Sequence, residues 1–224
     1  MTKCHTLVMS DLHLGSRVCR RDKIISVLKN IEFHTLVING DLFDSNDTEK
    51  LTDKDFEILE MLRKIAQNHT VLLIGGNHGR KLDVLAEDLG IEIRNEYAFT
   101  LGENRFLCFH GDEFDLFVKH FPMTSAMFGK LYYLIQKLST KKQKGPVMVK
   151  MIMKKILRVP RRQERLALKH GAARGAQVVI CSHTHIPHME TKNGILFINS
   201  GSFCDNPSNY VAISPSGETE LVAV

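Results

Sequence analysis

The sequence lacks any long hydrophobic run. No stretch of its 224 residues approaches the roughly 20 consecutive apolar residues that a transmembrane helix needs. The first residues, MTKCHTLVMSDLHLG, place acidic and histidine side chains directly after a short apolar run, and we see no export signal in them. Internal repeats and low-complexity tracts are also absent, which excludes a repeat architecture. We therefore expect a cytoplasmic protein without a membrane-spanning segment.

Cysteine is scarce, and its five positions are scattered and odd in number: Cys4, Cys19, Cys108, Cys181 and Cys204. Such a set does not form an obvious disulfide framework, so we expect reduced thiols. Hydrophobic residues make up 43% of the sequence and charged residues 25%, which is ordinary for a globular protein. The length suffices for a sizeable core. We expect a single domain over residues 1–224.

Acidic residues are almost missing from one part of the chain. Between Lys119 and Lys169 the sequence has fourteen Lys and Arg but one acidic residue, Glu164. This window carries a formal charge of +13, which leaves −8 on the rest of a chain whose net charge is +5. Such asymmetry indicates an anionic partner for the basic segment, namely a phosphate compound, a nucleic acid or an anionic membrane.

Short apolar strands alternate with amphipathic helices in the first 89 residues. The predicted strands cover residues 6–9, 36–38 and 70–74, and the predicted helices cover 21–31 and 52–68. Later strands are predicted in FLCF, QVVIC and GILFIN and in a closing hairpin around Pro215-Ser216-Gly217. The basic segment at about 114–170 interrupts this second part. The alternation predicts an α/β fold.

Polar side chains follow five of the predicted strands at the point where each strand ends. The blocks read DLH, GD, GNH, HGD and HTH, and they begin at Asp11, Gly40, Gly76, His110 and His183. In α/β sheets, binding sites gather beyond the carboxyl ends of the strands. We therefore expect these distant residues to converge at one edge of the fold.

The candidate ligands in the five blocks are oxygen and imidazole donors. They are Asp11, His13, Asp41, Asn77, His110, His183 and His185. None of these candidates is a cysteine, so a tetrahedral thiolate zinc site is not indicated, whereas mixed nitrogen and oxygen donors suit Mn, Fe, Zn, Ni or Co. Seven ligands are too many for one transition ion but suit two ions about 3.5–4 Å apart that share a carboxylate. We expect two divalent ions, with Mn²⁺ as the leading candidate and Asp41 as the bridge.

Each block alone has an ordinary interpretation, because Asp-x-His, Gly-Asp and Gly-Asn-His are common in turns and His-Thr-His fits a surface loop as well as a metal site. All five blocks in this order, each after a strand, are hard to attribute to chance. The ordered set resembles the calcineurin-like metallophosphoesterase superfamily over residues 11–185. The resemblance implies a four-layer αββα sandwich, two sheets flanked by helices, with a dinuclear site at one edge.

The resemblance also implies roles for individual residues. One metal would be bound by Asp11, His13, Asp41 and His185, and the other by Asp41, Asn77, His110 and His183. His78 is similar to the catalytic histidine of the family, which lies beside the metals without binding them. Two divalent ions activate water for attack on phosphorus, and a histidine protonates the leaving oxygen. Asp44 and Asp112 are candidates for orienting the ligands, with ordinary surface carboxylates as the alternative.

One block departs from the family pattern. The family usually continues as Gly-Asn-His-Asp or Gly-Asn-His-Glu, whereas this sequence reads GNHGR. Gly79 therefore replaces an acidic residue that would orient His78. Arg80 is a candidate for contact with the phosphate of a substrate.

The basic segment is the main clue to the substrate. Its predicted helices at 121–138 and 147–159 are amphipathic and rich in Met, and Lys150, Lys154 and Arg158 share one face of the second. We predict a helical lid at about 114–170 whose cations bind substrate or an anionic membrane surface, so that peripheral contact with the cytoplasmic face of the membrane is a hypothesis. A helical hairpin packed on the sandwich is the alternative.

The blocks SDLHLG, GDLFD and HGDEFD, followed by a basic helical insert, look most like the UDP-2,3-diacylglucosamine hydrolase branch. This resemblance implies a diphosphatase of the lipid A pathway that acts on a lipid-linked nucleotide and releases UMP. A nucleotide or nucleic-acid phosphodiesterase is the alternative, although the segment lacks the regular aromatic residues on which bases stack. A binding protein that keeps the fold without catalysis is a third interpretation.

Overall fold

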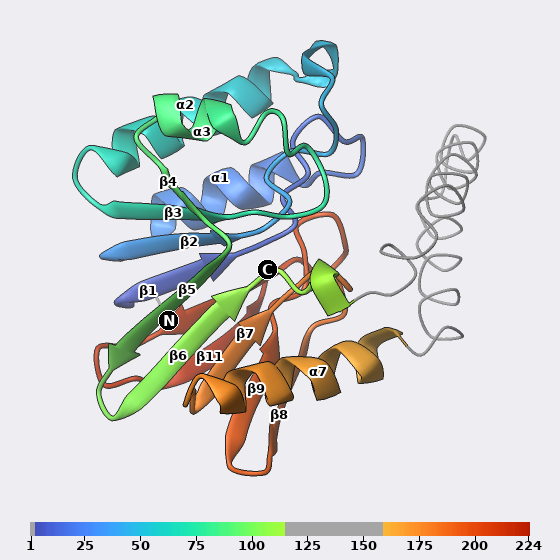
Figure 1. The fold of residues 1–224 in the computed structure, drawn as a ribbon. Coiled ribbons are helices and arrows are strands. Elements are labelled where there is room, and N and C mark those ends of the chain that lie inside the picture. Colours follow the sequence, from blue (N-terminus) through green and yellow to red (C-terminus); the bar gives the residue numbers. More distant parts are fainter. Residues whose placement is uncertain (1–2, 115–158) are drawn as a thin grey trace.

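The computed structural model describes residues 3–114 and 159–224, and its strands form two β-sheets that pack face to face (Figure 1). The first sheet has six strands in the order β11-β10-β1-β2-β3-β4. Their bounds are β1 Thr6–Met9, β2 Thr35–Asn39, β3 Thr70–Ile74, β4 Glu92–Arg94, β10 Asn209–Ile213 and β11 Thr219–Ala223. Strands β1 to β4 are parallel, and β10 and β11 form the predicted antiparallel hairpin.

The second sheet has five strands in the order β5-β6-β7-β9-β8. Their bounds are β5 Glu96–Leu101, β6 Asn104–Phe109, β7 Val178–Cys181, β8 His188–Lys192 and β9 Ile195–Asn199. Strands β6, β7 and β9 are parallel, and β5 and β8 flank them as antiparallel edge strands.

Helices cover the outer faces of both sheets (Figure 1). Their bounds are α1 Arg21–Asn30, α2 Asp53–Ala66, α3 Val84–Asp88 and α7 Val159–Ala173, with the 3₁₀ helices η1 Thr48–Lys50 and η2 Asp112–Phe114. The first three helices lie over the first sheet and α7 lies over the second. The predicted α/β sandwich of two sheets flanked by helices is therefore confirmed.

Part of the predicted basic insert lies outside the described residues. The helix at 121–138, most of the helix at 147–159, and the candidate contacts Lys150, Lys154 and Arg158 fall there and stay predictions. Residues 159–170 form most of α7, which packs on β7 and β9. No helix in the described part of the chain is long and apolar enough to span a membrane.

Alternate side chains of the central strands enter two different cores. In β1, Leu7 and Met9 are buried in the core beneath α1 and α2, whereas Val8 between them is buried against the second sheet. A parallel strand buried on both faces needs apolar residues at every position, which explains the continuous apolar runs in the sequence. The parallel pairing of β1 with β2 and of β2 with β3 brings the carboxyl ends of these strands to a common edge.

The start of α2 is fixed by a buried carboxylate. The backbone nitrogen and the hydroxyl of Thr52, the N-cap residue of α2, both donate to Oδ2 of Asp55 at 2.8 Å. Arg21 of α1 donates to the same carboxylate with Nε at 2.7 Å and Nη2 at 2.9 Å. Since the Asp55 side chain is fully buried, this bidentate pair ties the two helices together.

Candidate metal centre

Unusual backbone geometry marks the loops that carry the five blocks. Among the described residues, six other than glycine have positive φ, between 47° and 65°. Five of them are candidate ligands: Asp11, His13, Asp41, His183 and His185. Each such conformation costs about 1–3 kcal/mol and persists where the surrounding fold enforces it, which is common at functional sites. The strain is therefore concentrated where the sequence predicts the metals.

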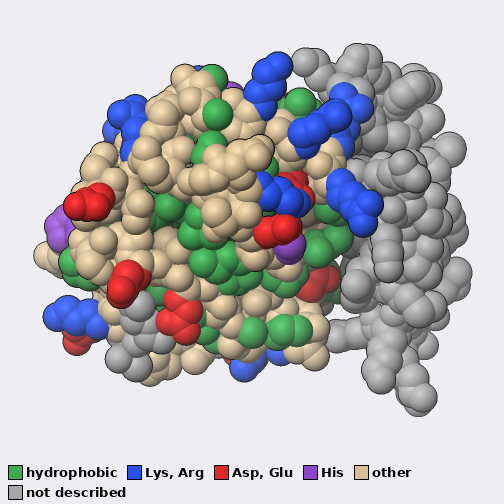
Figure 2. All heavy atoms as spheres, turned by 90° about the horizontal axis from the view of Figure 1, so that it is seen from below, with side chains coloured by type: hydrophobic (Ala, Val, Ile, Leu, Met, Phe, Trp, Pro, Cys, Tyr) green, Lys and Arg blue, Asp and Glu red, His purple; other side chains and the backbone are tan. Residues whose placement is uncertain are grey.

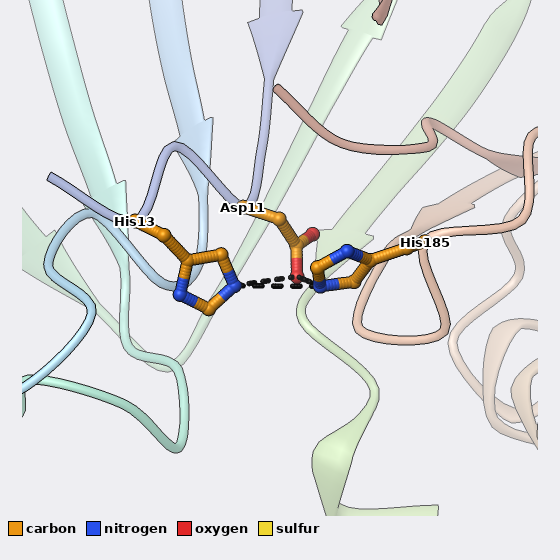
Figure 3. Close-up of side chains that lie close together, drawn as sticks. All are labelled: Asp11, His13 and His185. Atoms are coloured by element: carbon orange, nitrogen blue, oxygen red, sulfur yellow. Dashed lines mark hydrogen bonds and ion pairs between the residues drawn. The ribbon is translucent and has the colours of Figure 1, made fainter. Parts of the chain in front are cut away.

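Asp11, His13 and His185 point toward one another from the loops after β1 and β7 (Figure 3). Nε2 of His185 lies 2.9 Å from Oδ1 of Asp11 and 3.3 Å from Nε2 of His13. The three side chains are at most 8% exposed. One oxygen and two nitrogens that converge in this way form a set of ligand atoms suited to a single divalent ion.

Asp41 lies between this group and a second one. Its Oδ2 is 3.7 Å from Nε2 of His13 and 3.4 Å from Nε2 of His110. Asp11, Asp41 and His110 form the second group, whose ligand atoms all lie within 4.8 Å of one another. The carboxylate expected to bridge two ions is thus placed between two sets of donors, and Asp11 belongs to both sets.

Asn77 and His183 lie beside the second group. Nδ1 of His183 is 3.0 Å from Oδ1 of Asn77, and its ring meets the ring of His110 edge to face at 5.3 Å between centroids. The backbone nitrogen of His183 also donates to Oδ2 of Asp11 at 3.3 Å. The structure therefore brings all seven candidate ligands into one continuous cluster.

Glycines in two blocks leave the space that the ligands occupy. A Cβ on Gly40 would lie 2.0 Å from Nδ1 of His110, and a Cβ on Gly76 would lie 2.1 Å from Oδ1 of Asp41. Neither position can carry a side chain without moving a candidate ligand. The glycines of the GD and GNH blocks thus have a steric role in the cluster.

Hydrogen-bond partners orient the histidine rings. Nδ1 of His110 donates to the carbonyl oxygen of Asn39 at 3.0 Å, which directs Nε2 toward Asp41. Nδ1 of His185 lies 3.0 Å from Oδ2 of Asp205, so its Nε2 faces Asp11. An imidazole held at one nitrogen and directed inward at the other is the usual arrangement of a histidine that binds a metal.

The candidate orienting carboxylates differ in their contacts. Oδ1 of Asp44 lies 3.5 Å from Nδ1 of His13, in the position expected of a group that orients this ring. Asp112 begins η2, and its charge acts on His110. Sequence reasoning missed Asp205, which lies beyond the end of β9. Binding sites gather beyond the carboxyl ends of strands, and β9 is the sixth predicted apolar strand. Applied to β9, this rule indicates the loop that carries Asp205.

Buried charges in the cluster shift one another's pKa values. Burial by itself would lower the pKa of His110, but the adjacent Asp41 carboxylate outweighs it and raises the pKa to about 10. Burial would likewise raise the pKa of Asp11, yet the charge on His185 holds it well below its usual range. Nearby, burial and the Asp41 charge raise the pKa of Asp83 to about 6. The cluster therefore favours the ionised form of the Asp11 carboxylate, whereas it disfavours the ionised form of Asp83.

His78 is exposed beside the cluster, and backbone groups hold it. The backbone nitrogen of His78 donates to Oδ1 of Asp41 at 2.9 Å, and the ring Nδ1 donates to the carbonyl oxygen of Asp44 at 3.0 Å. The ring lies edge to face with His13 at 5.0 Å between centroids. A carbonyl thus orients the ring where the family pattern suggested an acidic side chain. Arg80 is exposed on the same loop.

Gly79 explains why this chain lacks the acidic residue. The glycine has φ +61°, and a Cβ there would lie 2.5 Å from Cβ of Phe43 and 2.8 Å from its carbonyl oxygen. Because Phe43 is fully buried, the loop cannot shift easily to make room. The departure from the family pattern is therefore required by the way this loop packs.

The residues present fit divalent metal ions. Nε2 of His110 is buried and makes no hydrogen bond to any residue in the described part of the chain. A buried polar atom without a partner is costly, and a cation between His110 and Asp41 would satisfy it. Carboxylate oxygens and imidazole nitrogens suit Mn, Fe, Zn, Ni and Co alike. The donors therefore support a metal centre without selecting the metal.

Comparisons with known proteins agree with this fold. The chain is similar to an archaeal phosphodiesterase, with a TM-score of 0.51 and 14% identity over 98% of this chain and 99% of the other. It is also similar to vacuolar protein sorting 29 from Cryptosporidium parvum, with a TM-score of 0.50 and 15% identity over 98% and 95% of the two chains. At these identities the likeness concerns the fold alone.

The family is identified from the sequence by a model of the calcineurin-like phosphoesterase superfamily domain, which matches residues 5–214. No curated protein matches the chain. Since the family model spans nearly the whole sequence, the chain belongs to the calcineurin-like phosphoesterase superfamily.

Proposed function

We propose that the protein hydrolyses phosphoester or pyrophosphate bonds at a centre of two divalent metal ions. The observation that carries this proposal is the convergence of seven donors from five strand ends around Asp41. Bound there, two ions would supply an activated water and neutralise the charge of a phosphate group. Asp11, His13, Asp41 and His185 would hold one ion. Asp41, Asn77, His110 and His183 would hold the other.

His78 is the proposed proton donor to the leaving oxygen. Its ring is exposed next to His13, so a phosphate at the cluster could reach it, while its Nδ1 is engaged with the Asp44 carbonyl. This arrangement leaves Nε2 as the nitrogen that faces outward for proton transfer. Arg80, exposed two residues further along, is the proposed contact for a phosphate oxygen.

A phosphodiester assay tests the general proposal. Wild-type protein with added Mn²⁺ should hydrolyse bis-p-nitrophenyl phosphate, and His78→Ala should lower kcat by about 10²–10⁴-fold while the bound metal stays nearly unchanged. His69→Ala serves as the matched control, because His69 is exposed and lies outside the cluster. Metal content measured by mass spectrometry separates a role of His78 in proton transfer from a role in holding the metal ions. No turnover with any divalent metal would favour the binding-protein interpretation.

For the substrate, we propose UDP-2,3-diacylglucosamine or a closely related lipid-linked nucleotide, hydrolysed with release of UMP. The proposal is supported by the sequence of the blocks and by the cationic, Met-rich segment after HGDEFD. It also includes two divalent ions with Mn²⁺ preferred, a single domain over residues 1–224, and contact of the basic segment with an anionic membrane surface. A protein in the cytoplasm would meet such a substrate at that surface.

Release of UMP from UDP-2,3-diacylglucosamine, followed by chromatography, tests the substrate. Turnover comparable to that of the model ester or faster supports the proposal. Hydrolysis of bis-p-nitrophenyl phosphate without release of UMP would instead favour a nucleotide or nucleic-acid phosphodiesterase. Binding to anionic liposomes that persists after Lys150, Lys154 and Arg158 are neutralised would remove the membrane role of that face.

A further inference from the structure

A groove lies on the outer face of the second sheet, between α7 and the hairpin of β8 and β9. It has a volume of about 850 Å³. Figure 2 views this side of the molecule and shows hydrophobic side chains gathered in its middle, with Lys and Arg beside them. The volume falls within the range of pockets that bind small molecules, about 300–1,000 Å³.

Apolar side chains form part of the lining of the groove. They include Leu168 and Ala172 of α7, Ile195 and Phe197 of β9, and Ile186. Phe197 is only 2% exposed, so the floor presents no free aromatic face on which a nucleobase could stack. An aliphatic ligand therefore fits the lining better than a nucleic acid does.

Polar side chains at the end nearest the metal centre are engaged with one another. Nε2 of Gln163 donates to the carbonyl oxygen of Ser182 at 2.9 Å, and Nδ2 of Asn199 donates to Oγ1 of Thr184 at 3.0 Å. These bonds remove the donors that a polar ligand would use. Thr184, which lines the groove, lies between the candidate ligands His183 and His185 in the sequence.

A row of cations borders the groove along α7. Arg161, Arg165 and Lys169 line it at intervals of four residues, which places successive side chains about 6 Å apart on one face of the helix. All three are exposed, and none forms an ion pair within the part of the chain that the structure describes. Their charge is therefore available to a ligand.

The carboxylates in the groove are already paired. Lys192 of β8 contacts Glu164 of α7, and its Nζ lies 2.9 Å from Oε2 of Glu190. This cluster keeps a formal charge of about −1, and the three cations on α7 outweigh it. The unpaired charge of the groove is consequently positive and lies on the α7 side.

We propose that this groove binds a single-chain anionic amphiphile, with the acyl chain on the aliphatic floor and the anionic head at the row of Arg161, Arg165 and Lys169. An aliphatic lining bordered on one side by unpaired cations is complementary to a ligand with these two parts. The site is distinct from the candidate metal cluster, because none of the seven candidate ligands lines it. The inference does not depend on the proposed catalytic function.

Calorimetry with dodecylphosphonate tests the proposal, since its C–P bond resists hydrolysis. A parallel titration with methylphosphonate, which has the same head without the chain, measures any binding of the head group at the metal cluster. Wild-type protein should bind dodecylphosphonate, and dodecyl maltoside, which has the same chain and a neutral head, should bind at least about tenfold more weakly. Equal binding of the two amphiphiles, or no binding of the phosphonate, would overturn the proposal.

Variants locate the binding. The double variant Arg161→Glu/Arg165→Glu should weaken phosphonate binding by at least about tenfold, and Ile195→Thr on the floor by about threefold or more. Arg162→Glu is the matched control, because Arg162 is an exposed neighbour on the same helix that does not line the groove. It should change binding less than about twofold.

A second pair of substitutions covers the case in which charge reversal impairs folding. Arg161→Gln/Arg165→Gln removes the charge without reversing it and should still weaken binding, while thermal unfolding confirms the fold. If Arg162→Glu weakens binding as much as the groove variants do, the effect is a general one of net charge and the groove is not the site. Retention of a glutamate-rich peptide in place of the phosphonate would reassign the groove to an acidic protein partner.

Discussion

Restoring the acidic residue of the family pattern at position 79 should damage this protein. In Gly79→Asp, the new Cβ would lie 2.5 Å from Cβ of Phe43 and 2.8 Å from its carbonyl oxygen. The loop must then move, and it carries His78, whose backbone nitrogen contacts Asp41 and whose ring contacts the Asp44 carbonyl. The substitution therefore couples a packing defect to the position of the proposed proton donor.

Gly175 supplies a control for the stability that is lost when a residue other than glycine adopts the left-handed backbone conformation. It has φ +67°, close to the +61° of Gly79, but a Cβ there would meet nothing within 4 Å. Gly175→Asp should therefore cost only the left-handed conformation, about 1–2 kcal/mol. Gly79→Asp should cost this amount and a further 1–3 kcal/mol or so for overpacking against Phe43.

Urea unfolding of the two variants measures that difference, and hydrolysis of bis-p-nitrophenyl phosphate measures its effect on the site. We expect kcat of Gly79→Asp to fall by about tenfold to a hundredfold, since a shift of about 1 Å in a catalytic group has this effect. Gly175→Asp should keep its activity. Equal stability of the two variants, or a higher kcat in Gly79→Asp, would refute the reasoning about this loop.

Further changes test the ion pair, an orienting carboxylate and the metals. Asp55→Asn should lower the free energy of unfolding by about 2–3 kcal/mol at pH 7, because it breaks the buried pair with Arg21. Burial would raise the pKa of Asp55, but the hydrogen bonds from Arg21 and Thr52 hold this pKa below its usual value. The stabilisation by the ionised carboxylate is therefore fully present above the unfolded pKa of about 3.9. It is lost as the pH falls through the pKa that Asp55 has in the folded protein. Urea unfolding of both proteins at pH 7 and pH 3 should show the difference shrink at pH 3, and a constant difference would contradict this assignment. Asp205→Asn should weaken Mn²⁺ binding by about 10–100-fold in calorimetry, since Asp205 orients His185; an unchanged Kd would show that the contact is dispensable. Mn²⁺ at about 100 times its Kd should raise the free energy of unfolding of chelator-treated protein by about 2.7 kcal/mol, and Asp41→Asn should abolish the gain.

The central strands and the donor set could be predicted because their signals are local. Residues 6–9 were predicted as a strand and form β1, since a parallel strand buried on both faces has an uninterrupted apolar run. Each of the five blocks follows such a run directly. The rule that sites gather beyond strand ends then indicated one cluster, although His13 and His185 lie 172 residues apart.

The edge strands could not be predicted in the same way. Four of the five residues of β8 are exposed, so the sequence HMETK has no apolar alternation that would mark it as a strand. Its pairing with β9 and its position beside α7 create the groove, which no local pattern reveals. Asp205 was missed for a related reason, because its contact with His185 depends on how the loop after β9 folds back.

The sequence by itself determined the chemistry of this protein: the donor types, their order, and the absence of thiolates follow from residues that neighbour each strand. Only the tertiary structure decided the geometry, that is, which groups orient the candidate ligand histidines, why position 79 must be glycine, and where unpaired cations border a partly apolar groove. The physical reason is that hydrophobic runs and turn residues act over a few neighbours. Distances between loops, and the burial that shifts their pKa values, arise only when the two sheets pack.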